Sequence, residues 1–392
     1  MAEWKTYKLS EIGTVVGGAT PSTSVSSYYG GDIPWLTPKD LSNFQDRYIE
    51  KGERNITQEG LDSCSAQLLP ANTVLFSSRA PIGYVAIAKN PIATNQGFKS
   101  IIPNEKVDSL FLYYILKYNK DRIEAMGSGT TFKEVSGAVM KNVEISLPGL
   151  EEQRRIAGIL SAIDDKIENN RRINTNLELQ AQTLYKQRFV DNRSDDWEEK
   201  PLSEIVFFQE GPGIRNWQYV EKKGVRFINI RCINDGDVNV QNANMISEDE
   251  ACGKYAHFLL EPLDIVMSCS GTLGRYAIIR REHLPLCLNT SVIRFRPAQC
   301  IEDYSFVYGY LSSAEFLNKQ EEMACGSVQA NFGPTHLKQI KIKVPPKDYR
   351  MKYNNVVMPI INTMLKNRSE INMLSSLRDF LLPKLMNGEI KL

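Results

Sequence analysis

LLPANTVLFSSRAPIGYVAI, residues 68–87, returns 191 residues later as LLEPLDIVMSCSGTLGRYAI, residues 259–278. The apolar runs and one glycine match, whereas most polar residues between them differ. Other pairs keep an offset of 191 to 197: Trp4 corresponds to Trp197, and MKNVEISLP (140–148) corresponds to LKQIKIKVP (337–345). An offset this constant over most of the chain predicts two copies of one structural unit.

Each copy begins with a stretch whose pattern predicts a mixed domain. Short apolar runs bounded by turn residues, such as NTVLF (72–76) and GYVAIA (83–88), are typical of strands. The segment DSLFLYYILKYNKDRIEAM (108–126) is more helical. We therefore expect α+β domains over residues 1–148 and 193–345.

Apolar residues with heptad spacing follow each domain, in residues 149–192 and 346–392. Steps that alternate between 4 and 3 are typical of a coiled-coil seam. A helix of ~39 residues is ~60 Å long, too long to be covered by its own domain. We expect the two helices to pair antiparallel, with the domains at opposite ends; an amphipathic helix lying on its own domain is the alternative. The predicted seams are Ile156, Leu160, Ile163, Ile167, Asn170, Asn174, Leu177, Ala181 and Leu184, then Val357, Ile360, Met364, Asn367, Ile371, Leu374, Arg378, Leu381 and Leu385.

Polar residues and prolines interrupt these seams. Asn170 and Asn367 are equivalent in the repeat, and a seam asparagine either fixes the register of the pair or faces solvent. Pro359 and Pro383 have no counterpart in the first helix. We therefore expect the second helix to start or kink near 359 and to bend near 383.

Composition indicates a globular protein without a membrane span. Hydrophobic residues make up 42% and charged residues 24% of 392 residues, and no apolar run approaches the ~20 residues of a span. No signal peptide is evident, and seven scattered cysteines favour a reduced, cytoplasmic setting. The net charge of +1 means that any nucleic acid would be met by local patches.

Catalytic motifs are missing from the sequence. There is no P-loop, no G-x-S-x-G elbow and no metal-ligand spacing among His257, His283 and His336. The Pro-Pro-aromatic sequence that grips a target amine is also absent, and the charged Glu198-Glu199-Lys200 run is poor support for a nuclease. We expect a non-catalytic binding protein. A coiled-coil scaffold with two protein-binding heads, or a stand-alone DNA-modifying enzyme, is the alternative.

Two similar heads suit a target with two-fold symmetry, and duplex DNA is the commonest one. Arg, Asn and Gln can read base edges, whereas Ser, Thr and Lys mainly hold phosphates. Arg79 falls opposite Ser270 in the repeat, so we interpret its segment as a shared turn with a variable tip and not as a catalytic loop. The candidate contacts are Thr20, Ser22, Lys39, Ser77, Ser78, Arg79, Asn95, Gln96, Thr130, Thr131 and Lys133, then Arg215, Asn216, Arg231, Ser270, Thr272, Arg275, Asn289, Gln329 and Asn331.

Several segments together carry a resemblance to a known family. They are GGATPSTSVSSYYGGDIPWLTPKDL (17–41), SSRAPIGYVAI (77–87), TNQGF (94–98), GTTFKEVSG (129–137), LPGLEEQRRIAGILSAIDDKI (147–167) and LRDFLLPKLMNGEI (377–390). The chain resembles the specificity subunits of type I restriction–modification systems over its whole length.

The resemblance implies two target-recognition domains related by a pseudo-two-fold axis and separated by a pair of long antiparallel helices. It implies that double-stranded DNA is read at a bipartite, asymmetric site, one half per domain, and that the chain is not an enzyme and has no cofactor of its own. The implied partners are two modification (methyltransferase) subunits, which use S-adenosylmethionine, and restriction subunits, which use ATP and Mg.

Overall fold

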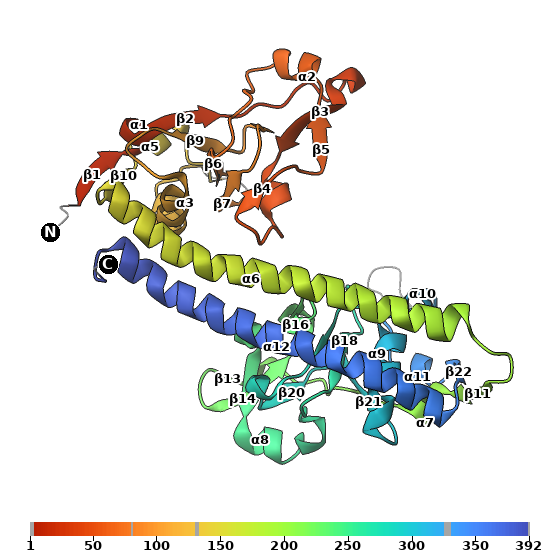
Figure 1. Ribbon diagram of the computed structural model, residues 1–392. Helices are drawn as coiled ribbons and strands as arrows, with labels where there is room; N and C mark the ends of the chain where they lie inside the picture. Colours follow the sequence, from red (N-terminus) through yellow and green to blue (C-terminus); the bar gives the residue numbers. More distant parts are fainter. Residues whose placement is uncertain (1–3, 80, 130–132, 325–330, 391–392) are drawn as a thin grey trace. The chain divides into compact units, whose positions relative to one another are not determined.

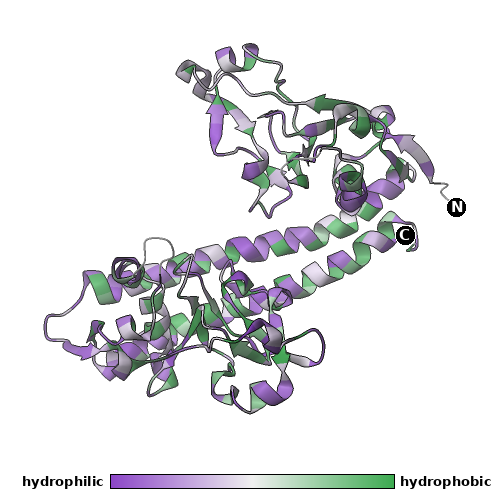
Figure 2. Ribbon diagram, turned by 180° about the vertical axis from the view of Figure 1, so that it is seen from behind, coloured by the Kyte–Doolittle hydropathy of each residue, from purple (hydrophilic) through white to green (hydrophobic). Residues whose placement is uncertain are grey.

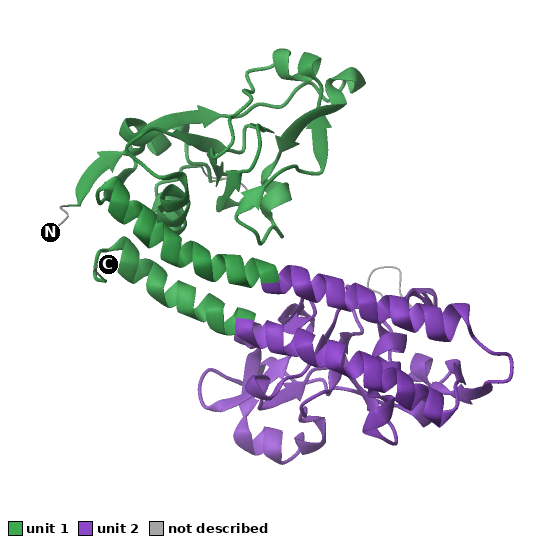
Figure 3. Cartoon of the chain, in the orientation of Figure 1, with its two compact units in different colours: residues 1–169, 371–392 green, residues 170–370 purple. Residues whose placement is uncertain are grey.

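The computed structural model describes residues 4–79, 81–129, 133–324 and 331–390 (Figure 1). The chain divides into two compact units: unit 1 comprises residues 1–169 and 371–392, and unit 2 comprises residues 170–370 (Figure 3). Each unit contains one globular part and one portion of each long helix. Three predicted contacts, Thr130, Thr131 and Gln329, lie outside the described residues.

The globular part of unit 1 is built on a five-stranded sheet of order β2-β9-β6-β7-β4 and a three-stranded sheet of order β5-β3-β8. Strands β6 and β7 form the antiparallel hairpin that the repeated segment predicts. The strands are β1 (Lys5–Lys8), β2 (Gly13–Gly17), β3 (Tyr29–Leu36), β4 (Tyr48–Ile49), β5 (Arg54–Ile56), β6 (Val74–Ser78), β7 (Ile82–Ala88), β8 (Ala93–Thr94), β9 (Lys99–Pro103) and β10 (Glu144–Leu147). The helices are α1 (Leu9–Ile12), α2 (Gln58–Asp62), α3 (Ser109–Tyr118), α4 (Lys120–Ala125) and α5 (Gly137–Lys141), with 3-10 turns η1 (Ser26–Tyr28) and η2 (Pro38–Leu41).

Unit 2 repeats this topology. Its main sheet has the order β12-β21-β18-β19, which matches β2-β9-β6-β7, and β14 pairs in parallel with β20 as β3 does with β8. The strands are β11 (Glu198–Pro201), β12 (Val206–Glu210), β13 (Tyr219–Val220), β14 (Gly224–Ile228), β15 (Ile233–Asn234), β16 (Asp237–Val238), β17 (Asn244–Ser247), β18 (Ile265–Ser268), β19 (Tyr276–Ile278), β20 (Leu286–Leu288), β21 (Val292–Pro297) and β22 (Lys341–Val344). The helices are α7 (Leu202–Ile205), α8 (Glu248–Cys252), α9 (Tyr304–Leu311), α10 (Ala314–Met323) and α11 (Pro334–Leu337), with the 3-10 turns η4 (Asn216–Gln218) and η5 (Ile230–Cys232) among the short turns. The repeat and the α+β class are confirmed.

Two long helices run through both units. Helix α6 spans Leu150–Tyr185 and continues as a π-helical turn to Asp191, and α12 spans Lys347–Met386. Of the two expectations at Pro359, a start is wrong, because α12 begins at Lys347 and the proline lies inside the helix, whereas the kink there and the bend near Pro383 stay predictions. Tyr353 and Val357, which precede the proline, are fully buried in the core of unit 2. Burial of this face outweighs the hydrogen bond that a proline removes.

The helices pair antiparallel inside each unit. In unit 2, the side-chain amide of Asn170 donates to the Glu370 carboxylate, and the side-chain amide of Asn367 donates to the Asn174 side-chain oxygen at 2.8 Å. In unit 1, Ile156 and Leu160 share one core with Leu385. The seam asparagines thus join the helices; Asn170 is fully buried, and Asn367 is partly buried. Each helix also packs on its globular part, so pairing and domain packing, posed as alternatives, occur together.

Hydropathy follows this packing. In Figure 2 the hydrophobic segments gather in the sheets of each unit, while both long helices alternate hydrophobic and hydrophilic stretches. Among the described residues, none of the helices combines the length and apolarity that a membrane span needs.

Candidate nucleic-acid interface

Four segments of unit 1 meet at one end of β6. The Ser78 amide donates to the Gly97 carbonyl at 2.7 Å, and the Ser78 carbonyl accepts from the Val135 amide at 2.9 Å. The Ala19 amide donates to the Thr94 carbonyl at 3.0 Å. These backbone bonds assemble the segments around residues 19, 78, 95 and 134, which we call the loop cluster.

Unit 2 builds the same loop cluster. The Cys269 amide donates to the Ser291 carbonyl at 3.0 Å, and the Cys269 carbonyl accepts from the Phe332 amide at 2.8 Å. In the repeat, these two hydrogen bonds correspond to the two that Ser78 makes in unit 1. The two units therefore share one hydrogen-bonded framework, on which the exposed side chains are free to differ.

A glycine is required at one point of this framework. A Cβ on Gly18 would lie 2.1 Å from the Thr94 carbonyl oxygen, and one on Gly211 would lie 2.5 Å from the Asn289 carbonyl oxygen. The loop after β2 or β12 can lie against the neighbouring loop only without a side chain there.

The hydroxyl of Ser77 closes a turn. It donates to the Pro81 carbonyl at 2.8 Å and accepts from the Tyr84 amide at 2.8 Å. Ser268 does the same in unit 2, donating to Thr272 at 2.7 Å and accepting from Arg275 at 3.0 Å. The repeated segment is thus a shared structural turn.

The prediction that Ser77 and Ser78 contact DNA is wrong. Both residues are fully buried. The Ser77 hydroxyl serves the turn, and the Ser78 hydroxyl donates to the Gly97 carbonyl at 3.1 Å. Short polar residues beside a turn are usually exposed, but here Gly97 and Phe98, just before β9, and Val135, just before α5, lie against them.

Replacing Ser77 with Ala should destabilise unit 1 by about 1–3 kcal/mol, because the Tyr84 amide loses its acceptor in a buried site. The Ser268→Ala variant should lose a similar amount in unit 2. Urea unfolding followed by hydrogen exchange measures both effects. The exposed Ser42→Ala variant is the control and should change stability by less than about 0.5 kcal/mol. Equal stability of Ser77→Ala and Ser42→Ala would contradict the assigned role.

Charged and polar side chains form a continuous strip on the loop cluster of unit 1. Glu134 lies between Arg79, at 3.8 Å, and Lys99, at 3.3 Å. Lys99 also donates to the Gln96 carbonyl at 3.4 Å, and the Thr20 hydroxyl donates to the Gln96 side chain. We call these five residues the polar strip. The structure thus brings together three predicted contacts, Thr20, Arg79 and Gln96.

Lys99 and Glu134 were missed by the sequence analysis. Both lie in or beside segments that carry the family resemblance, which was the available signal. Of the other candidates, the Asn95 side chain accepts from the Gly97 amide at 2.8 Å, and Lys133 is exposed. Ser22 and Lys39 make their side-chain contacts elsewhere, to Ser24 and Glu53.

Unit 2 carries different side chains at the same places. Ser270 bridges to Asn331 through the backbone, as Arg79 does to Glu134. Arg275 donates to Asn234 at 3.4 Å. Asn289 uses its side-chain oxygen to accept from the Ser291 amide at 2.9 Å, as Asn95 does in unit 1. The remaining candidates are exposed: Arg215, Asn216, Arg231 and Thr272.

A carboxylate at the edge of this second cluster is partly buried. Glu210 accepts from the Thr290 hydroxyl at 3.4 Å, and burial raises the pKa of its carboxyl above the ordinary value. Within the described part of the chain, no three His, Cys, Asp or Glu side chains are grouped so that they could hold a metal ion.

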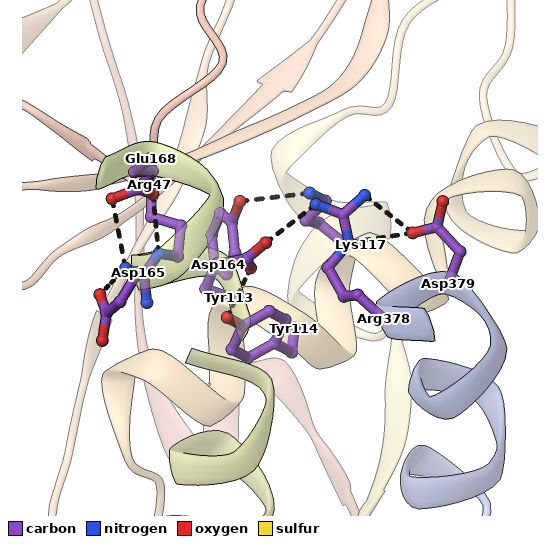
Figure 4. Close-up of polar contacts among 9 residues, drawn as sticks. All are labelled: Arg47, Tyr113, Tyr114, Lys117, Asp164, Asp165, Glu168, Arg378 and Asp379. Carbon is purple, nitrogen blue, oxygen red and sulfur yellow. Dashed lines mark hydrogen bonds and ion pairs between the residues drawn. The ribbon is translucent and has the colours of Figure 1, made fainter. Parts of the chain in front are cut away.

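A polar network holds the globular part of unit 1 to both long helices (Figure 4). Asp164 of α6 accepts from the Tyr114 hydroxyl at 2.7 Å and from Arg378 of α12 at 2.9 Å. Burial, together with the negative charge of Asp164, raises the pKa of Tyr114 well above its ordinary value, so this phenol remains a donor at neutral pH. Asp164, a charged residue of α6, thus has a structural role: it binds the globular part and α12.

Arg47 makes a second connection in the same network. Its guanidinium donates to Glu168 at 2.9 Å and contacts Asp165, and its amide donates to Glu168 at 3.0 Å. Arg47 is 4% exposed. The segment before β4 is therefore fastened to α6 by a buried ion pair, which heptad spacing alone could not indicate.

Both copies of the sequence repeat match one known protein family. A family model described as the type I restriction modification DNA specificity domain matches residues 1–179 and 194–369. The type I restriction enzyme MjaIX specificity subunit of Methanocaldococcus jannaschii is 35% identical, over 99% of this chain and 94% of that protein. The EcoR124I/EcoR124II specificity subunit of Escherichia coli is 31% identical over 41% of each chain. The crystal structure of a type I restriction–modification S subunit from M. genitalium has a TM-score of 0.58 at 18% identity, over 98% of this chain and 96% of that one, which is a likeness in fold.

Proposed function

Since the chain belongs to the type I restriction–modification DNA specificity family, we propose that it is the DNA-recognition subunit of such a complex and that each unit reads one half of a bipartite site. One observation supports this best: the two units share a loop framework but present different side chains on it. Unit 1 presents Arg79 and Glu134 where unit 2 presents Ser270 and Asn331. Different side chains on one framework read different bases, so the target is asymmetric.

The loop clusters provide the chemistry for both kinds of DNA contact. Base edges are read by Arg, Asn and Gln side chains, and phosphates are held by Lys, Thr and Ser. We assign base reading to Arg79, Asn95, Gln96, Arg215, Asn216, Arg275, Asn289, Gln329 and Asn331. We assign backbone contacts to Thr20, Ser22, Lys39, Lys99, Thr130, Thr131, Lys133, Arg231, Ser270 and Thr272.

The catalytic activities belong to partner subunits in this proposal. Recognition domains cover residues 1–148 and 193–345, and the helical segments 149–192 and 346–392 separate the half-sites and dock the partners. Two methyltransferase subunits supply S-adenosylmethionine chemistry, and restriction subunits supply ATP- and Mg-dependent cleavage, in the cytoplasm where the DNA lies. The similarities give no support to a protein-binding scaffold or a stand-alone enzyme.

Mapping of methylated adenine tests the proposal. Co-expression with the cognate methyltransferase subunit should produce genome-wide N6-methyladenine in one bipartite motif that depends on this chain. The purified chain alone, incubated with labelled S-adenosylmethionine and DNA, should transfer no methyl groups. Methylation without a partner, or a motif that persists when this chain is omitted, would overturn the proposal.

Replacing Arg79 with Ala should weaken one half-site by about 1–3 kcal/mol and relax its sequence, because a base-reading guanidinium is lost. Arg79→Lys should recover little, since an ammonium lacks the bidentate fork. Competition binding with each half-site varied in turn measures the effect. The exposed Lys89→Ala variant is the control, because Lys89 pairs with Glu50 outside the loop cluster. An equal loss for every sequence would make Arg79 a phosphate contact.

A further inference from the structure

Trp217 is the most exposed large apolar side chain among the described residues, at 80%. It lies in the 3-10 turn η4, immediately after Arg215 and Asn216, which are also exposed. An indole is large and mostly apolar, so leaving it in water forgoes a substantial gain from burial. Such a side chain indicates a surface that a partner covers.

The position of Trp217 is fixed by its neighbours. Gln218 is 9% exposed and donates to Glu250 at 2.7 Å and to the Tyr255 hydroxyl at 3.2 Å. Its side-chain oxygen accepts from the Arg215 amide at 2.9 Å, which closes the turn. Ile214 packs against the core beneath. Trp217 is therefore exposed on a turn that hydrogen bonds and packing hold in place.

The same turn continues the loop cluster of unit 2. The segment that leads to Trp217 begins at Gly211. The Gly211 amide donates to the Val292 carbonyl at 3.3 Å, and Gly211 lies against the backbone of Asn289. Arg215 and Asn216, two positions and one position before the indole, carry donors suited to phosphates or base edges. DNA is the partner that these neighbours suit, because it offers both phosphates and base edges.

We propose that Trp217 packs as a wedge against a partly unstacked base step in the half-site read by unit 2. This rests on the proposed function. Aromatic side chains stack on any base, and a flexible step is cheaper to open than a stiff one, so the wedge selects sequence through deformability. In unit 1 the corresponding 3-10 turn is η1, whose second residue is Ser27. The distortion is therefore confined to one half of the site.

The test uses the complex of the full chain with its methyltransferase subunit, bound to duplexes with 2-aminopurine at successive positions of the mapped site. We expect fluorescence to rise at one step, in the unit 2 half only, and this rise to vanish in Trp217→Ala. Affinity should fall about tenfold or more, and Trp217→Phe should retain most of it. Ser27→Ala is the matched control and should change neither readout.

Three results would separate the possibilities. Unchanged affinity and fluorescence in Trp217→Ala, with sequence-specific binding intact, would overturn the wedge and leave the proposed function standing. Loss of methyltransferase binding without an effect on DNA would make Trp217 a protein contact and also overturn it. If the wild-type complex shows no sequence preference, the proposed function itself fails.

Discussion

Replacing Arg47 with Ala destabilises unit 1 by about 3–5 kcal/mol, the cost of removing one partner from a buried ion pair. The Arg47 and Glu168 side chains are only 4% and 9% exposed. Water cannot compensate the Glu168 charge at such burial, so the carboxylate is costly once the guanidinium that lies against it is gone. Asp165 is 68% exposed, and its share of the loss is small.

Calorimetry of the full chain, with hydrogen exchange to assign each transition to a unit, measures this loss. Unit 2 should unfold as before. Arg155→Ala is the matched control, because Arg155 pairs with Glu152 on the same helix while 52% exposed, and it should cost less than about 1 kcal/mol. The double variant Arg47→Met, Glu168→Leu should recover most of the stability, since an apolar pair replaces the charges. Equal losses in Arg47→Ala and Arg155→Ala would contradict a structural ion pair.

Lengthening both long helices by seven residues should widen the gap of the methylated motif by about three base pairs. Seven residues add ~10 Å to a helix, and base pairs are ~3.4 Å apart. The insertions belong between 169 and 170 and between 370 and 371, where the chain passes from one compact unit to the other. Every contact inside each unit is thereby kept, including the bond from Asn170 to Glu370. A heptad also preserves the seam.

Methyladenine mapping reads the new motif directly. Both half-sites should be unchanged, and methylation of the original motif should fall to background. The control is the same seven residues inserted between Asp195 and Asp196, two exposed residues outside the long helices, which should leave the gap as it was. Altered half-sites with an unchanged gap would show that the helices do not set the spacing.

Local pattern was sufficient where neighbours in sequence decide the structure. The hairpin of β6 and β7 follows from alternating residues around a turn, and α6 begins at Leu150, one residue from the start that its heptad spacing predicts. The expected helix start at Pro359 was wrong because the proline rule considers one backbone hydrogen bond. It ignores the core that Tyr353 and Val357 enter on the same helix.

The polar surface could be predicted only in part. The repeat singled out Arg79 as a variable tip, and the structure places it beside Glu134 on the polar strip. The same segment also suggested Ser77 and Ser78, which are buried. Whether a short polar side chain near a turn is covered depends on strands that arrive later in the chain, and composition carries no record of that.

The sequence by itself determined the repeat, the two α+β domains and the two long helices, because periodicity and turn residues act over a few positions. Only the tertiary structure decided which polar groups are structural and which are exposed. Arg47 meets Glu168 across 121 residues of chain, and Trp217 remains exposed because Gln218 is anchored by Glu250 and Tyr255. Burial and ion pairing arise from residues that folding brings together, so their consequences are set by contacts between distant segments.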